Sequence, residues 1–154
     1  MSKENILGEL GNSYEAIEEQ VDLSTIAICS EAVGILQVLK DSTNDYCKNR
    51  KQFGQSISAN QAIQHRLVDM MIEYEQAKSI LYMAITADLS NSDERRKAAS
   101  AAKARIGKAI KFVGENAIQL HGGMGVVDEY MISHFFKRAT TVSYTHLRAH
   151  ETHE

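Results

Sequence analysis

Apolar residues recur along most of the chain at intervals of three and four, the spacing of one face of an α-helix. The clearest run advances in steps of 4, 3, 4, 3, 4 and 3: Ile63, Leu67, Met70, Tyr74, Ala77, Leu81 and Ala84. A seam of this kind suits antiparallel helices packed in a bundle. It predicts a helix that begins after the stretch "QFGQSIS".

Two other long segments have the same periodicity. The first predicted helix covers residues 14–48, with apolar positions Ile17, Val21, Ile28, Ala32, Ile35 and Leu39. Another starts within "NSDERR", where Asn91 and Glu94 have the spacing of a capping box. It continues through Ala102, Ile106, Ala109, Val113, Ala117 and Leu120. A shorter fourth helix is predicted over residues 128–138.

These segments are joined by short loops, and no segment shows the alternation of a strand. The pattern therefore predicts an all-α fold, an antiparallel up-and-down four-helix bundle. We expect its core to include Leu67, Met70, Tyr74, Leu81, Ile106, Val113 and Leu120.

Composition agrees with one helical domain. The 154 residues include no proline, and 44% are hydrophobic. The net charge of -3 offers no basic surface for nucleic acid, and because no 18 apolar residues run together, no membrane span is expected. Cys29 and Cys47 lie on one predicted helix about 27 Å apart, beyond disulfide reach. We therefore expect reduced thiols and a cytoplasmic protein.

The first candidate site is "RKQFGQSISANQ", residues 50–61. In a structural interpretation, Gly54 ends the first helix, and Ser58 with Gln61 forms a capping box at the start of the second. In a functional interpretation, Arg50 and Gln61 flank a turn between two helices. Arginine binds phosphate through two parallel hydrogen bonds, and a helix N-terminus favours anions. Spacing alone leaves both interpretations open.

The second candidate is "QLHGGMG", residues 119–125. A glycine C-cap with His121 packed on the bundle would explain it structurally. Alternatively, Gly122 and Gly123 bring bare backbone against a cofactor, with Gln119 nearby as donor and acceptor. Neither motif decides the matter without the other.

The sequence signals for a metal site or an acid–base pair are weaker. His65 and Asp69 lie one helical turn apart and are interpreted as a surface or interface pair. His146 and His150 do not form the HExxH pattern of zinc proteases, because Glu154 stands where the second histidine would be. The predicted helices contain no Glu-x-x-His pair for a di-iron site. We therefore predict no metal site.

Together the two motifs resemble one family. The stretch "YCKNRKQFGQSISANQAIQHRLVDMMIEYEQAKSI" matches an R-x-Q-F-G…Q…D-M…E pattern, and "AIQLHGGMGVVDEYMISHFFKR" matches Q-x-x-G-G-x-G…E-Y…R. Both patterns, in this order and about 70 residues apart, are similar to the C-terminal helical domain of acyl-CoA dehydrogenases. "AICSEAVG" and "HFFKR" resemble a branch with small subunits of heteromeric enzymes, such as the pimeloyl-CoA and steroid side-chain dehydrogenases.

The resemblance implies a flavin site. In the family, FAD lies across a subunit interface and is contacted by the arginine and glutamine of the first motif and by the backbone of the second. Carried over, the FAD-binding residues are Arg50, Phe53, Gln61, Gln119, Leu120, His121, Gly122 and Gly123. Phe53 would pack near the flavin or its adenine end. The glycines would then be both a helix stop and a cofactor contact.

The family reaction is α,β-desaturation of an acyl-CoA thioester, in which a carboxylate removes the α-proton and hydride leaves to the flavin. The resemblance implies an acyl-CoA substrate, a homo- or hetero-oligomer (dimer or tetramer), and electron-transfer flavoprotein as electron acceptor. We expect no catalytic residue in this chain. The alternative is a bundle that serves assembly alone, without a flavin role.

Both ends depart from the bundle pattern. Residues 1–12 resemble the last edge of the family's β domain, residues 13–141 its C-terminal helical domain, and the chain is expected to be an inactive fragment. The family's catalytic glutamate occurs in an E-G-T context, often Gly-Asp in the branch named above. Here residues 142–154 read "VSYTHLRAHETHE", which resembles translated sequencing adapter. We expect this tail to be non-native and to contact the bundle little.

Overall fold

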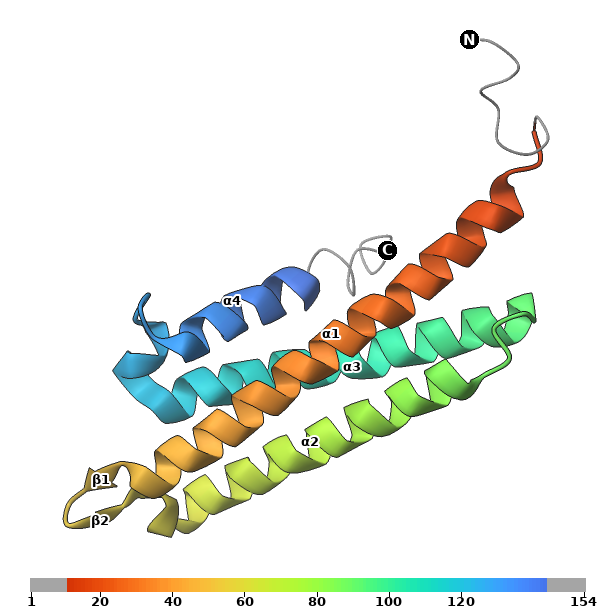
Figure 1. Ribbon diagram of the computed structural model, residues 1–154. Helices are drawn as coiled ribbons and strands as arrows, with labels where there is room; N and C mark the ends of the chain where they lie inside the picture. The colour runs from red at the N-terminus through yellow and green to blue at the C-terminus, as the bar shows by residue number, and fades with distance from the viewer. Residues whose placement is uncertain (1–10, 144–154) are drawn as a thin grey trace, which may run out of the picture.

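The computed structural model describes residues 11–143, so the remnant expected before Gly11 and most of the expected tail lie outside the described residues. Four helices alternate in direction (Figure 1): α1 (Tyr14–Asn49), α2 (Gln61–Thr86), α3 (Ser92–His121) and α4 (Met131–Val142). Helix α3 packs against the other three. The predicted all-α up-and-down bundle is confirmed.

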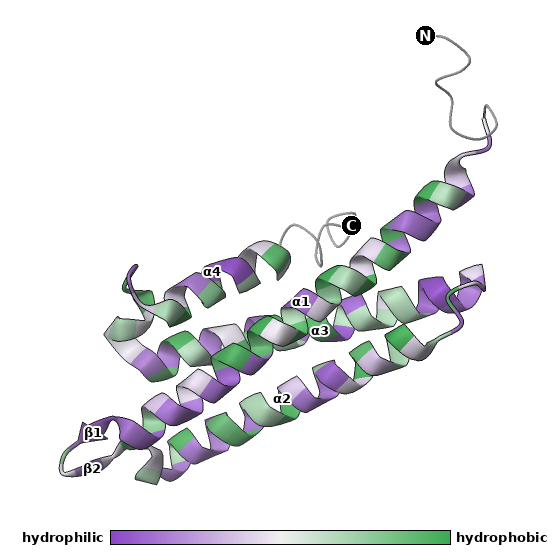
Figure 2. Cartoon of the chain, in the orientation of Figure 1, coloured by the Kyte–Doolittle hydropathy of each residue, from purple (hydrophilic) through white to green (hydrophobic). Residues whose placement is uncertain are grey.

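The core lies along the seams predicted from the sequence. Of the seven side chains expected there, six are buried, and Leu67 is partly buried. Alanines at Ala102, Ala109 and Ala117 line the buried side of α3, where small residues let helices approach closely. Hydrophobic and hydrophilic residues alternate along each helix as in amphipathic helices (Figure 2).

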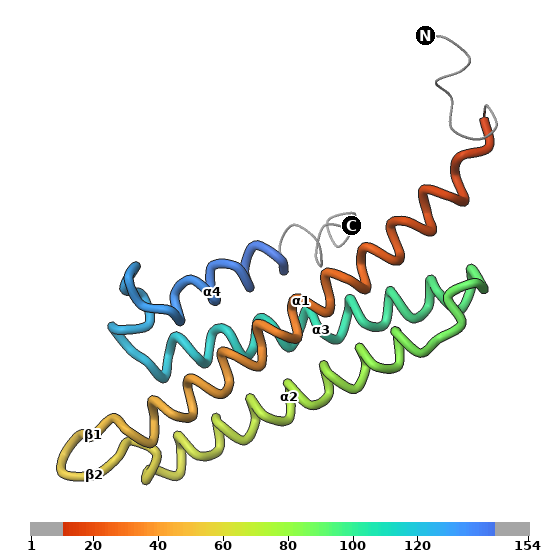
Figure 3. The backbone as a smooth tube through the Cα atoms, in the orientation of Figure 1, coloured from red at the N-terminus to blue at the C-terminus, as the bar shows by residue number. Residues whose placement is uncertain are grey.

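Helix α1 is exposed along its first turns and packs against the bundle from Ile26 onward. Its first turns run away from the other helices (Figure 3), and Tyr14, Ile17 and Val21 are exposed there. By length and composition alone α1 could cross a membrane, a property that core helices of soluble proteins share. Nine of its residues are buried against the bundle.

Both cysteines lie in the buried part of α1 and are free thiols, as expected. Burial raises the pKa of Cys29 to about 11, partly offset by Lys103, and burial also raises the pKa of Cys47. Both thiols therefore stay protonated near neutral pH and act as small core residues.

The connection from α1 to α2 differs from the sequence interpretation. Helix α1 ends at Asn49, five residues before Gly54, and a small hairpin follows, β1 (Lys51–Gln52) paired with β2 (Gln55–Ser56). Phe53 and Gly54 form its tip with φ of 53° and 84°. Two consecutive positive φ values are typical of the tight hairpin turn whose twist matches that of the flanking strands. Gly54 is therefore a turn glycine and does not end the helix.

The predicted Ser58–Gln61 capping box is also wrong. Ser58 lies within the short 3₁₀ helix η2 (Ile57–Ala59), and Asn60 occupies the N-cap position of α2. The side chain of Asn60 donates to the carbonyl of Ile57 instead of accepting from the first turn of α2 (3.1 Å). The extra 3₁₀ turn moved the helix start two residues beyond the point that the S-x-x-Q spacing predicts.

The N-terminus of α3 is capped as expected. Asn91 Oδ1 accepts hydrogen bonds from the backbone N–H groups of Asp93 (3.0 Å) and Glu94 (3.2 Å). In a full capping box the Glu94 side chain would also accept from the backbone N–H of Asn91. Here that N–H donates to the carbonyl of Asp88 instead (3.2 Å). The cap is thus a one-sided Asn cap, in which the Asn91 side chain accepts from two first-turn amides.

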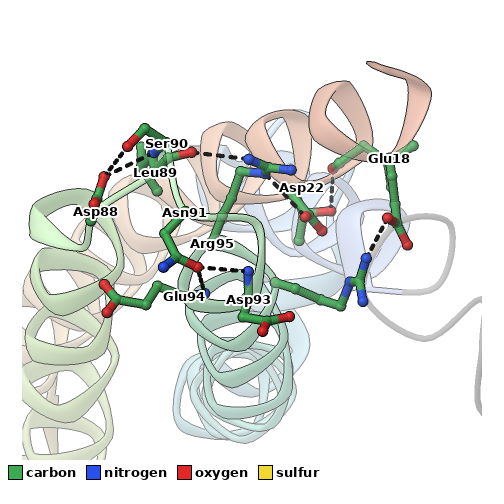
Figure 4. A network of polar contacts seen from close by, with 12 residues as sticks. Glu18, Asp22, Asp88, Leu89, Ser90, Asn91, Asp93, Glu94 and Arg95 are labelled. Carbon is green, nitrogen blue, oxygen red and sulfur yellow. Dashed lines mark hydrogen bonds and ion pairs between the residues drawn. The ribbon is translucent and has the colours of Figure 1, made fainter. Parts of the chain in front are cut away.

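A polar network fastens this α2–α3 loop to α1 (Figure 4). Arg95 is 6% exposed, and its guanidinium donates to Asp22 on α1 (3.3 Å) and to the carbonyl of Leu89 (3.0 Å). Arg96 forms a second, more exposed ion pair with Glu18. The loop at this end is therefore held by a buried cation as well as by apolar contacts.

Helix α4 begins three residues later and ends four residues later than predicted. Val142, which the sequence assigned to a tail with few contacts, is the last residue of α4 and is fully buried, and Ser143 is also buried. That expectation is wrong for these two residues. Residues 144–154 lie outside the described residues, and their foreign origin stays a prediction.

Candidate functional site

Both candidate motifs lie at the same end of the bundle. Because the helices alternate in direction, α1 ends, α2 begins and α3 ends there (Figure 1). Two contacts tie the motifs together: the rings of Tyr46 and His121 stack with centroids 4.3 Å apart, and Arg66 Nη1 donates to Asn116 Oδ1 (3.2 Å). Residues 50 or more positions apart in the sequence are thus neighbours in the fold.

Arg50 lies between the end of α1 and the first strand of the hairpin. Its N–H donates to the carbonyl of Tyr46 (2.8 Å), and its carbonyl accepts from the N–H of Ile57 (2.9 Å). These two bonds fix the backbone on both sides, while the side chain is exposed. A cation on a fixed backbone with a free guanidinium suits a phosphate ligand.

Phe53 is unusual in two ways. It has a positive φ, uncommon for any residue other than glycine, and its side chain is fully exposed. An exposed aromatic ring at a strained position gains nothing from packing within the described chain. The ring is therefore free to pack on a molecule outside it.

The three glycines of the second motif, Gly122, Gly123 and Gly125, differ in why glycine is present. Gly122 has φ 60° and ψ −138°, a conformation that is essentially restricted to glycine, and its N–H caps α3 on the carbonyls of Gln119 and Ile118. A Cβ on Gly125 would lie 3.0 Å from the Ile118 carbonyl oxygen and 3.2 Å from His121 Cβ. Gly122 is thus required by conformation and Gly125 by packing.

Neither backbone conformation nor packing within the described chain requires a glycine at position 123. Its φ lies outside the left-handed region, and no atom of the described residues comes within 4 Å of a Cβ built on it. It is exposed, as are its neighbours Gly122 and Met124 in η3 (Gly122–Val126). Bare backbone with open space above it is what a closely approaching ligand requires.

His121 faces inward. Its ring is 3% exposed, with Nδ1 2.8 Å from the Ala117 carbonyl, and it also lies 5.4 Å from the Tyr130 ring. For Nδ1 to donate there, the proton must be on that nitrogen; Nε2 is then a buried acceptor without a hydrogen-bond partner among the described residues. Burial lowers the pKa of His121 below its ordinary value, so the ring is neutral at pH 7.

The predicted site residues therefore divide into two groups. Six are exposed at this end of the bundle: Arg50, Phe53, Gln61, Gln119, Gly122 and Gly123. The side chains of Leu120 and His121 are buried, so only their backbone could contact a cofactor. Sequence reasoning missed Tyr46 and Tyr130 as supports of the glycine turn; the available signal was an aromatic residue one helical turn before Arg50.

Other candidates gain no support. His65 and Asp69 are both exposed on α2. Within residues 11–143 no group of three or more histidine, cysteine, aspartate or glutamate side chains could hold a metal ion. His146 and His150 lie outside the described residues.

Comparison with known proteins decides the family. Residues 14–145 match the family described as acyl-CoA dehydrogenase, C-terminal domain. The chain belongs to this family. The acyl-CoA dehydrogenase domain is 32% identical over 135 residues to the caffeyl-CoA reductase–Etf complex subunit CarC of Acetobacterium woodii, covering 88% of this chain and 35% of that protein. It is 33% identical over 137 residues to the human mitochondrial short-chain specific acyl-CoA dehydrogenase, covering 89% of this chain and 33% of the relative.

The fold agrees with solved structures of the family. Butyryl-CoA dehydrogenase from Megasphaera elsdenii superposes with a TM-score of 0.87 at 26% identity, covering 95% of this chain and 38% of that one. The glutaryl-CoA dehydrogenase–glutaryl-CoA complex gives 0.86 at 27% identity, covering 95% and 37%. The chain thus spans about a third of the length of the relatives it matches.

Proposed function

We propose that this chain forms the flavin-binding and oligomerisation domain of an FAD-dependent acyl-CoA dehydrogenase, which desaturates an acyl-CoA thioester between the α and β carbons. The observation that carries the proposal is the exposure of Arg50, Phe53, Gln119 and Gly123 at one end of the bundle. Three of them have features that contacts within the described chain do not explain. The Phe53 ring packs on nothing, position 123 does not require glycine, and the exposed Arg50 side chain lies on a backbone held by hydrogen bonds on both sides.

The residues present fit FAD. The Arg50 guanidinium suits the pyrophosphate, the amide side chains of Gln61 and Gln119 can donate to and accept from polar edges of the cofactor, and Phe53 offers a flat apolar surface. The open backbone at Gly123 admits a close approach. When bound, FAD supplies the hydride acceptor. The role of this chain is to bind and orient it, and we assign no catalytic base to the described residues.

The proposal extends to partners. CarC is named as a subunit of a complex with Etf, and a solved structure described as the electron transferring flavoprotein of Acidaminococcus fermentans is 30% identical to this chain. These relatives support electron-transfer flavoprotein as the acceptor. Exposed apolar residues along α2, namely Val68, Met71, Ile72, Tyr82 and Met83, support a homo- or hetero-oligomer with FAD shared across the interface. We propose a cytoplasmic location, in keeping with the two reduced thiols.

The alternative is an assembly subunit without flavin contacts. It shares the exposed apolar residues of α2 but gives no reason for a glycine at position 123. Flavin retention therefore separates the two proposals.

The test is a chimera in which residues 14–143 replace the matching domain of butyryl-CoA dehydrogenase from Megasphaera elsdenii, with bound FAD measured by absorbance after gel filtration. Arg50→Ala is expected to reduce FAD retention at least about tenfold, since a charge-assisted bond contributes about 1.5–3 kcal/mol. Lys51→Ala, which removes the neighbouring exposed cation, serves as the matched control and should retain FAD.

Glycine substitutions test the backbone approach. Gly123→Ala should weaken FAD retention without lowering the stability of the bundle, because the added methyl group meets open space in the described chain. Gly34→Ala on α1, where the space is equally open, should retain FAD fully. Full retention in both Arg50→Ala and Gly123→Ala would favour the assembly subunit.

A further inference from the structure

One pair of stacked rings joins the two halves of the proposed flavin site. Tyr46 lies one helical turn before Arg50, and its carbonyl accepts the Arg50 N–H (2.8 Å). His121 is the last residue of α3 and immediately precedes the turn glycines. Because the two rings stack at 4.3 Å with 30° between their planes, a displacement of either helix end must move or break the stack.

The His121 side chain also packs against the glycine turn, residues 122–125. Gly125 folds back so closely that a Cβ there would lie 3.2 Å from His121 Cβ, and Tyr130, which precedes α4, flanks the imidazole at 5.4 Å. The hydrogen bond from Nδ1 to the Ala117 carbonyl fixes the ring against its own helix. Contacts from α1, α3, η3 and the residue before α4 thus meet on one side chain.

We infer that His121 and Tyr46 are positioning residues: their stacked rings hold the glycine turn in fixed register with Arg50, so that both motifs present one continuous surface to the same ligand. The inference rests on the proposed function for the identity of that ligand, but the coupling between the two motifs is a property of the chain alone. The His121 ring is buried and Tyr46 is partly buried against it, so the two rings act on the ligand through the backbone that they position.

Amide hydrogen exchange of the free chain tests the coupling in both directions. Tyr46→Leu keeps apolar volume but removes the stack, and it is expected to accelerate exchange of the Gly122 and Val127 amides about tenfold. His121→Leu is expected to accelerate exchange of the Arg50 amide on α1 by a similar factor. Tyr46→Phe keeps the ring and should behave like the unsubstituted chain.

The amide of Ile106, in the middle of α3, is the internal reference. A purely structural role would accelerate Ile106 and the site amides by the same factor, and that result would overturn the inference. So would unchanged exchange at Gly122 and Val127 in Tyr46→Leu.

Flavin retention in the chimera gives the second measurement. Tyr46→Leu should lose FAD, and Tyr46→Phe should retain it. Full FAD retention in Tyr46→Leu, with Arg50→Ala still losing FAD, would overturn the positioning role while leaving the proposed function intact. Retention in Arg50→Ala would instead be a failure of the proposed function.

Discussion

At the scale of single residues, Arg95 belongs to the most buried of the ion pairs found among the described residues. Its guanidinium bonds to Asp22 and to the Leu89 carbonyl in a site where the side chains are 7% and 13% exposed. Arg95→Met keeps the apolar stem but leaves a poorly solvated carboxylate unpaired, so we expect it to lower the free energy of unfolding by about 3 kcal/mol. Urea denaturation followed by circular dichroism measures this.

Arg96→Met is the matched control, because Arg96 is adjacent, pairs with Glu18 and is half exposed. Exposed ion pairs contribute under about 1 kcal/mol, so its effect should be small. Equal losses in the two variants would show that burial of the Arg95 pair does not govern its contribution.

At the scale of elements, the caps of α2 and α3 differ although both starts have capping-box spacing. Asn91 bonds to the first-turn amides of α3, whereas Ser58 lies in η2 and bonds to the Ser56 hydroxyl (3.1 Å). Asn91→Ala should therefore cost about 1 kcal/mol of stability, the usual loss for an N-cap. Ser58→Ala should cost less than about 0.5 kcal/mol, since it removes no helix cap. Denaturation midpoints of the two variants check this, and a larger loss at Ser58 would contradict it.

At the scale of the whole molecule, the site end of the bundle should give stability a dependence on pH through His121. Burial lowers its folded-state pKa below the unfolded value of about 6.5, so the unfolded chain binds the proton more readily just below that pH. The free energy of unfolding should therefore fall as the pH drops below about 6.5, by at most about 1.4 kcal/mol per pH unit for one proton. The ring neighbours are the phenol rings of Tyr46 and Tyr130, which offer no carboxylate to stabilise an imidazolium.

His121→Phe retains an aromatic ring for the stack and removes the titrating group. Its stability, measured by denaturation between pH 5 and 7, should show a smaller slope than that of the unsubstituted chain. If the two slopes coincide, His121 does not control the pH dependence.

The helical periodicity determined the fold almost completely. Steps of three and four specify which side of each helix is apolar, and only an antiparallel bundle buries those sides with short loops, so Met70, Ile106 and Val113 are in the core as predicted. The Asn91 cap was also predictable, because it depends on neighbours two and three residues away. Local hydrogen bonding cannot, however, distinguish a helix start from a 3₁₀ turn that precedes it, and this is why Ser58 was misassigned.

The two motifs also predicted, from the sequence, which residues form the candidate site. The tertiary structure decided which of them are available. Whether Gln119 faces solvent while Leu120 and His121 face the core depends on how α3 is rotated against α1, and that rotation is set by packing along the whole bundle. The stack of Tyr46 on His121 joins residues far apart in the sequence, and the open space above Gly123 is defined by where the rest of the chain does not reach. No local pattern contains either fact, because each arises only when separate helices meet.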